Sequence, residues 1–220
     1  MAGQASLWVV FSLSFVTALS GALMPGPLLT YTIARTVQAP RRGWLTGAQV
    51  IAGHAALECL ILAGLVAGVV GFLRSPLASK IVGVAGGALL VSMGYGLIRE
   101  AVRGRVGDLG GAGTGSVSMH PVLAGALVSM SNPYWWIWWV TIGSAFLVRF
   151  HLTAERWTAL AAFFLGHELG DLGWYLSVST VLHLGRRVIP RAVIRGLLAA
   201  CGVVIIGFAA WLGVSPFLAA

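Results

Sequence analysis

The sequence predicts an all-α integral membrane protein with six transmembrane helices, and three observations lead to this fold class. Hydrophobic residues make up 58% of the chain and charged residues only 9%, whereas a soluble domain carries about 25% charged residues. A spanning helix needs roughly 20 mostly apolar residues, so 220 residues leave room for about six spans. The alternating pattern of a membrane barrel is absent, and only helices and closed barrels satisfy their backbone in lipid.

Six apolar stretches supply the expected spans. Each is longer than a buried strand requires, which favours a helix. The first 34 residues contain no Lys, Arg, Asp or Glu. A cleaved signal peptide has a positively charged start, so we interpret the first stretch as a retained span. The expected spans are residues 6–33, 43–73, 81–98, 122–148, 157–184 and 196–218.

Basic residues are unequally divided between the expected loops. Ten of the 14 follow the first, third and fifth spans, and four follow the second and fourth. Basic loops stay in the cytoplasm, so we expect a multi-pass protein of the plasma membrane with both termini outside. A net charge of +8 would suggest nucleic acid in a soluble protein, but these charges lie at the ends of apolar segments. The expected partners are the lipid bilayer, a small-molecule substrate and a second copy in a homodimer, with no nucleic acid.

One motif occurs in both halves of the chain. Residues Gly53–Glu58 in the second span and Gly166–Asp171 in the fifth both read Gly-His-x-x-x-carboxylate. We expect a first three-helix repeat at 1–103, a Gly-rich cytoplasmic linker at 104–119, and a second repeat at 120–220. Because three is odd, the second unit enters the membrane in the opposite sense. Inverted repeats of this kind are common in secondary transporters.

Each half begins with a span that is interrupted by proline. Proline removes a backbone donor and clashes with the carbonyl four residues earlier, and free backbone groups are tolerated in a membrane only beside protein or water. Carbonyl ends attract cations, and a restarting helix offers donors to anions. Two matching breaks therefore predict a zwitterion site near the midplane; the alternative is a pair of kinks that shape packing alone. The breaks contain Pro25, Gly26 and Pro27, then Asn132 and Pro133, and should free the carbonyls of Gly21, Leu23 and Ser129.

Ionisable residues lie inside the second and fifth spans. His54 and Glu58 share one helix face, as do His167 and Asp171. A charge at bilayer depth costs a few kcal/mol, so such residues usually face a cavity or a partner. We interpret the four as a proton-coupling site or a site for a substrate amine; the alternative is structural pairing between helices. Glu168 points about 100° away from His167 and is a weaker candidate.

Aromatic residues follow the second break. Tyr134 and Trp135 are candidates for a cation–π contact with a substrate amine, and an aromatic belt at the membrane interface is the equal alternative. For Trp138 and Trp139 the belt is favoured.

Together these motifs resemble the LysE family of amino-acid exporters, of the LysE/RhtB type. The resemblance covers nearly the whole chain. It implies six spans, an inverted repeat and proton-driven export of amino acids. Two positions depart from the family pattern: Leu28 stands where many members have Asn or Asp, and Tyr134 where many have Lys. The resemblance rests on Pro25-Gly26-Pro27, the glycines Gly43, Gly47 and Gly53 leading to His54 and Glu58, Asn132-Pro133, and the stretch from Gly166 to Asp171 with Trp174-Tyr175.

The sequence therefore predicts a secondary transporter that exports amino acids or similar small zwitterions, coupled to protons. A divalent-cation exporter is the alternative, because histidines and carboxylates in the second and fifth spans offer nitrogen and oxygen ligands. An enzyme is not expected: His167-Glu168-x-x-Asp171 is similar to a zinc metalloprotease helix, but no Glu follows His54 in the matching motif. We expect no cofactor and no resident metal. The candidate substrate-binding residues are Pro25, Gly26, Pro27, Asn132, Pro133, Tyr134 and Trp135; those for proton coupling or the substrate amine are His54, Glu58, His167 and Asp171.

Overall fold

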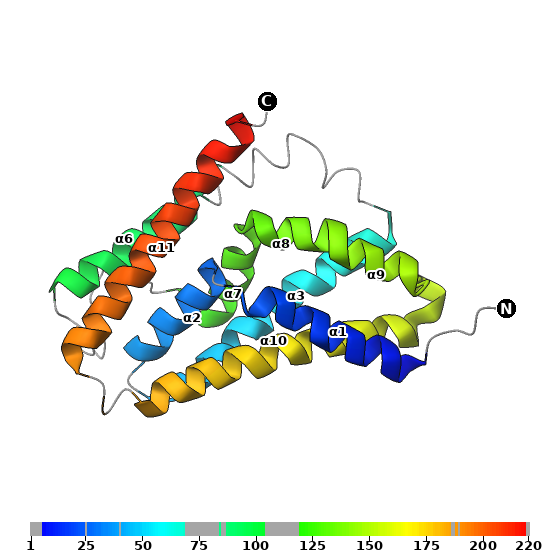
Figure 1. Cartoon of the computed structure of the whole chain (residues 1–220), viewed down its shortest axis with the longest axis horizontal. Helices are drawn as coiled ribbons and strands as arrows, with labels where there is room; N and C mark the ends of the chain where they lie inside the picture. Colours follow the sequence, from blue (N-terminus) through cyan, green and yellow to red (C-terminus); the bar gives the residue numbers. More distant parts are fainter. Residues whose placement is uncertain are drawn as a thin grey trace.

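The computed structural model describes residues 6–24, 26–39, 41–68, 84, 87–103, 119–185, 188 and 190–218. Within these residues every regular element is helical (Figure 1). Pro25 and nearly all of the expected linker lie outside the described residues. The first half contains α1 (Leu7–Ala22), α2 (Pro27–Gln38), the 3₁₀ turn η1 (Gly43–Leu45), α3 (Thr46–Val66) and α6 (Gly87–Arg103).

The second half contains short helices followed by two long ones. A π-helical turn, η3, lies between two of the short helices, and a 3₁₀ turn, η4, precedes the first long helix. The elements are α7 (Pro121–Met130), α8 (Pro133–Trp138), η3 (Trp139–Gly143), α9 (Ser144–Arg149), η4 (Ala154–Arg156), α10 (Trp157–Gly185) and α11 (Arg191–Leu218).

Membrane-spanning capacity differs between the described helices. The helical stretch Gly43–Val66 is long and apolar enough to cross a bilayer by itself. Two bent pairs raise the number to three if each is one span: Leu7–Ala22 with Pro27–Gln38, bent by 76°, and Tyr134–Arg149 with Ala154–Gly185, bent by 79°. The expected total of six spans therefore stays a prediction.

Both proline-containing segments end one helix and begin another. Pro27 occupies the first turn of α2, and Pro133 occupies the first turn of α8. Proline suits this position because the first amides of a helix have no intrahelical acceptor in any case. The chain therefore breaks before each proline.

The expectation of free carbonyls at Gly21 and Ser129 is wrong. The backbone N–H of Met24 donates to the Gly21 oxygen over 3.1 Å, and that of Asn132 donates to the Ser129 oxygen over 3.0 Å. The last turn of each helix tightens, so that its orphaned carbonyls gain partners from three residues later in the chain. These two oxygens are consequently not open cation ligands.

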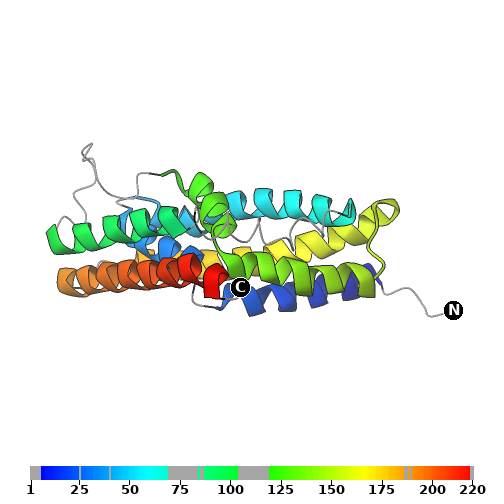
Figure 2. The same ribbon diagram turned by 90° about the horizontal axis from the view of Figure 1, so that it is seen from above.

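Glycines bring two pairs of helices into backbone contact. A Cβ atom on Gly53 of α3 would overlap the Val122 carbonyl of α7, and one on Gly166 of α10 would overlap the Phe11 carbonyl of α1. These are the first residues of the two Gly-His motifs. The middle helix of each half thus packs against the broken first helix of the other half (Figures 1 and 2).

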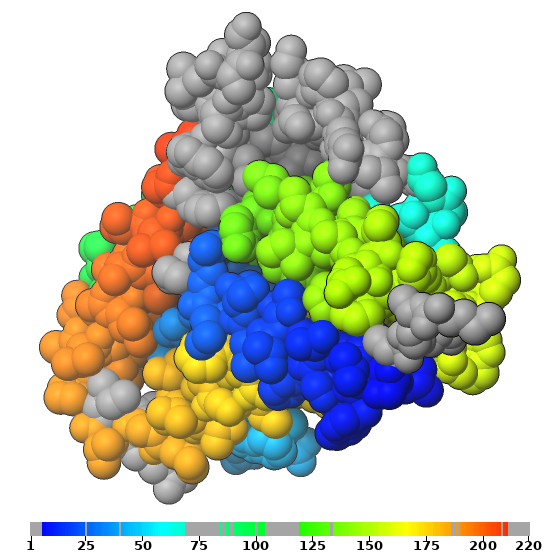
Figure 3. Space-filling model, turned by 45° about the vertical axis from the view of Figure 1, so that its right-hand side comes forward, coloured from blue at the N-terminus to red at the C-terminus, as the bar shows by residue number. Residues whose placement is uncertain are grey.

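The apolar side chains form two clusters. One joins α2, α3, α6, α7 and α11, and the other joins α1, α3, α10 and the aromatic side chains of α8 and η3. Figure 3 shows α1 on one face between α10 and the segment that contains α8 and α9. Helices α6 and α11 pack side by side through Gly94 and Gly202, apart from the aromatic cluster.

Candidate functional site

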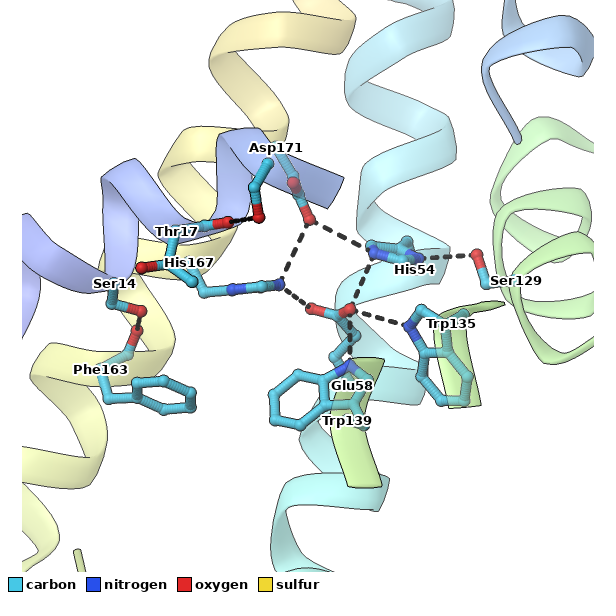
Figure 4. A network of polar contacts seen from close by, with 11 residues as sticks. Ser14, Thr17, His54, Glu58, Ser129, Trp135, Trp139, Phe163, His167 and Asp171 are labelled. Carbon is cyan, nitrogen blue, oxygen red and sulfur yellow. Dashed lines mark hydrogen bonds and ion pairs between the residues drawn. The ribbon is translucent and has the colours of Figure 1, made fainter. Parts of the chain in front are cut away.

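The four ionisable residues of the two motifs meet in one buried ring (Figure 4). Nε2 of His54 lies 2.9 Å from Oε1 of Glu58 and 3.3 Å from Oδ2 of Asp171. Nε2 of His167 lies 3.2 Å from Oε2 of Glu58 and 3.6 Å from the same Asp171 oxygen. Imidazoles and carboxylates alternate around this ring, which we call the His-carboxylate ring. The two halves of the chain contribute equally to it.

Two indoles hold Glu58 in place. The Nε1–H groups of Trp135 and Trp139 each donate to Oε1 of Glu58 over 2.9 Å. Glu58 is only 1% exposed, and a buried carboxylate is tolerated only when its oxygens have partners. The aromatic segment after the second break therefore serves as the binding partner of the carboxylate on α3.

Helical spacing brings both indoles to one oxygen, and a π-helical turn begins at the second of them. Trp135 and Trp139 are four residues apart and thus lie on one face. The ladder then widens, because the N–H of Ser144 bonds to the Trp139 carbonyl five residues earlier. Gly143 leaves room for the ring: a Cβ there would lie 2.7 Å from Cε3 of Trp139. Such single π turns occur frequently at functional sites.

The predicted aromatic belt is wrong for Trp138 and Trp139. Trp138 is 5% exposed and Trp139 is fully buried, whereas belt residues face lipid. Both rings pack against His167, with ring centroids 4.7 and 5.4 Å from the imidazole. Burial beside the His-carboxylate ring, and not the membrane interface, determines the position of both side chains.

A serine links His54 to the neighbouring helix α7. Nδ1 of His54 lies 2.6 Å from Oγ of Ser129, and that hydroxyl donates to the Gly125 carbonyl over 2.7 Å. Because the hydroxyl hydrogen is used in this bond, Nδ1 is the donor to Ser129. A Cβ on Gly125 would overlap the Val50 carbonyl of α3. Gly125 thus allows the close approach that brings Ser129 within reach of the imidazole.

A cavity of about 90 Å³ lies against the ring. It has room for several water molecules or one small solute. Of the predicted site residues, Pro27 is buried at the start of α2 and is not part of the cavity wall, Pro133 begins α8, and Pro25 is outside the described residues. The predicted residues that do line the cavity are Gly26, His54, Glu58, Asn132, Tyr134, Trp135, His167 and Asp171.

The two departures from the family pattern also line this cavity. Leu28 contributes an apolar side chain, and Tyr134 is partly exposed. Asn132 caps α8, since its Oδ1 accepts the Tyr134 N–H over 3.0 Å. The departures therefore alter the wall of the cavity.

Sequence reasoning missed several parts of the site. Trp139 could have been found, because it lies one helical turn after Trp135. Ser129 carried no signal, since a serine in an apolar helix usually bonds to its own backbone. Tyr175 and Ala18 complete the cavity wall from α10 and α1. Their roles depend on which helices face each other.

A cation is the ligand that this ring suits best in electrostatic terms. His54, Glu58 and Asp171 offer donor atoms within 4.8 Å of one another, which would also admit a metal ion. However, Oε1 of Glu58 already accepts two indole hydrogens. These hydrogens occupy Oε1, so a metal ion would have only Oε2 of this carboxylate as a ligand. Protons and ammonium groups can join such a hydrogen-bonded ring without displacing the indoles.

A helical, apolar chain with a buried ionic ring beside a cavity defines a membrane transport protein. The chain belongs to the LysE type translocator family, whose sequence model matches residues 19–215. This match confirms the predicted family. No curated protein and no solved structure matches the chain.

Proposed function

We propose that this chain exports amino acids or similar small zwitterions across the plasma membrane in exchange for protons. The observation that carries the proposal is a single cavity that joins an ionic ring to the start of a broken helix. Gly26 and Leu28 line this cavity together with Glu58 and Asp171. A zwitterion needs both a negative and a positive partner, and the cavity wall offers one of each.

The positive partner is the N-terminus of α2. Its N-cap, Gly26, has no side chain to accept the first amides, and Pro27 has no N–H. The amides of Leu28 and Leu29 have no acceptor within the helix, and the helix dipole favours an anion there. We assign the substrate carboxylate to this end of the cavity.

The negative partner is the His-carboxylate ring. A substrate ammonium can take the place of an imidazole proton beside Asp171, which holds its two histidines at 3.3 and 3.6 Å. Tyr134 and Trp135 also line the cavity, and an aromatic ring face favours a cation. Substrate and proton then compete for one set of carboxylates, which is the basis of an exchange.

The proposal includes six spans in two inverted repeats. Reciprocal packing supports it, because Gly53 contacts α7 in the same way that Gly166 contacts α1. Each half also contains a helix that restarts at a proline. The charge distribution of the loops supports both termini outside.

Flux in proteoliposomes tests the proposal. Purified protein should move radiolabelled amino acids, and a pH gradient should drive them above the equilibrium level. Asp171→Asn should abolish accumulation, whereas Glu155→Gln, on the exposed turn η4, should leave it unchanged. If a folded protein moves no amino acid under any gradient, the proposal is refuted. Transport of manganese, nickel or zinc in the same liposomes would favour the divalent-cation alternative instead.

A further inference from the structure

Glu168 is a buried carboxyl group that the His-carboxylate ring does not use. It follows His167 on α10 and is only 9% exposed. Neither of its oxygens receives a hydrogen bond from any donor in the described part of the chain. It is also absent from the cavity wall. Such a group needs an explanation, because buried polar atoms are normally paired.

The neighbour of Glu168 is another carboxylate. The groups that act electrostatically on Glu168 are Glu58, His54 and Asp171, all of which belong to the ring. Helix α1 and turn η1 also pack on α10 but contain no ionisable side chain. The remaining charged or titratable groups on the elements packed against α10 are the exposed Cys59 of α3, Tyr31 and Arg35 of α2, and Glu155 and Arg156 of η4.

A buried carboxylate that no donor reaches is unfavourable as an anion, and nearby Glu58 adds to the cost, so Glu168 holds a proton. Oε1 of Glu58 accepts three donors, two of them indoles that are neutral, and its Oε2 faces His167. Glu58 is thus the member of the pair that is held as the anion. In this conformation the proton belongs to Glu168.

A comparison of the two motifs shows that Glu168 is present in only one of them. The residue after His54 in the first motif is Ala55, and the residue after His167 is Glu168. The four ring contacts are complete without Glu168. A carboxyl group that only held helices together would be paired with a donor. Glu168 has no such donor and is tolerated here because it carries a proton.

We propose that Glu168 carries the proton that this transporter exchanges for its substrate, an inference that rests on the proposed function. When the substrate ammonium reaches Asp171, the positive charge of the ammonium offsets the negative charge that ionised Glu168 adds beside Glu58. The O–H bond of Glu168 then breaks, the electron pair stays on the carboxylate, and the proton passes by way of Glu58, which lines the cavity, to cavity water. When the substrate departs, a proton from the opposite side of the membrane forms the O–H bond again.

Glu168→Gln tests this role, because glutamine has the shape of the protonated acid. The variant should exchange labelled for unlabelled amino acid across the liposome membrane. It should lose accumulation driven by a pH gradient. Glu155→Gln is the matched control and should retain both activities. Gradient-driven accumulation at the wild-type level in Glu168→Gln would overturn the proposal.

Proton release provides a second measurement that needs no membrane. Amino acid added to the lightly buffered wild type in detergent should release protons to an indicator dye, and Glu168→Gln should release none. Equal release by both proteins would also overturn the proposal. If Glu168→Gln does not fold, Glu168→Met replaces the carboxyl by an apolar side chain of similar size, with the same expectations. A wild type that moves no amino acid would refute the proposed function itself, and this outcome is distinct from a defect confined to the variant.

Discussion

Glu58 and Asp171 occupy the same place in the same motif, yet their surroundings differ. Glu58 accepts three contacts of 2.9 Å at Oε1, from one imidazole and two indoles. Among the described residues, Asp171 pairs through Oδ2 with the two imidazoles of the ring, over 3.3 and 3.6 Å. The second half of the chain supplies the indoles, and it places them against the carboxylate of the first half.

These different surroundings give the two carboxylates different roles in the site. Indole N–H groups do not lose their hydrogens, so their bonds to Glu58 persist in every protonation state of the ring. The longer contacts of Asp171 come from histidines, whose ring nitrogens can gain or lose a proton. We infer that Glu58 fixes the geometry of the site and that Asp171 changes partners during transport.

The largest expected effect on stability is that of removing Glu58. Glu58→Ala leaves two indoles without their acceptor and two imidazoles with Asp171 alone. Breaking a buried ion pair in this way costs about 3–5 kcal/mol. Asp171→Ala should destabilise the protein clearly less, while still abolishing transport. Unfolding free energies measured by denaturant titration in micelles provide the comparison, and an equal loss in both variants would contradict the assignment of Glu58 as the anchor.

The next effect concerns the glycines that precede the two histidines. Gly53→Ala and Gly166→Ala both force a methyl group against a backbone carbonyl of the opposite half, and overpacking of this kind costs about 1–3 kcal/mol or more. Gly173→Ala is the control on α10, because a Cβ there meets nothing within 4 Å. Thermal unfolding should show lower midpoints for the first two variants only. If Gly173→Ala is equally harmful, loss of helix contact is not the cause.

The smallest effect is expected at the indoles. Trp139→Phe keeps the buried ring but removes one hydrogen bond to Glu58, and a bond of this kind inside a membrane protein contributes about 1–2 kcal/mol. Trp157→Phe, at a residue that is 69% exposed, should be neutral. A double-mutant cycle with Glu58→Ala, which removes the acceptor, measures the interaction. No coupling between the two positions would show that the indole packs beside Glu58 without anchoring it.

The parts of the site that could be predicted are those that stand out against an apolar background. His54, Glu58, His167 and Asp171 are rare residue types within spans, and their spacing of four already places each pair on one face. The aromatic residues gave no such contrast. The sequence favours the membrane interface for Trp138 and Trp139, because an interfacial belt and a buried cluster have the same composition. Only the packing of the two rings against His167 distinguishes a buried cluster from a belt.

The carbonyl prediction failed for a related reason. Proline at position 133 does remove a donor from the Ser129 carbonyl, as the sequence implies. The local chain then supplies another donor, the Asn132 amide, by tightening the last turn of α7. Backbone groups released by a sequence feature are paired again wherever the chain can bend to reach them.

The sequence by itself determined the helical, membrane-embedded character of the chain, its duplicated motif and its family. These properties depend on composition and on spacing along one helix, which are local. The tertiary structure decided that both motifs close into one ring, that two indoles hold Glu58, and that Glu168 is left beside it without a donor. Those contacts join residues more than 70 positions apart, and they exist only because glycines at the helix crossings let the backbones meet.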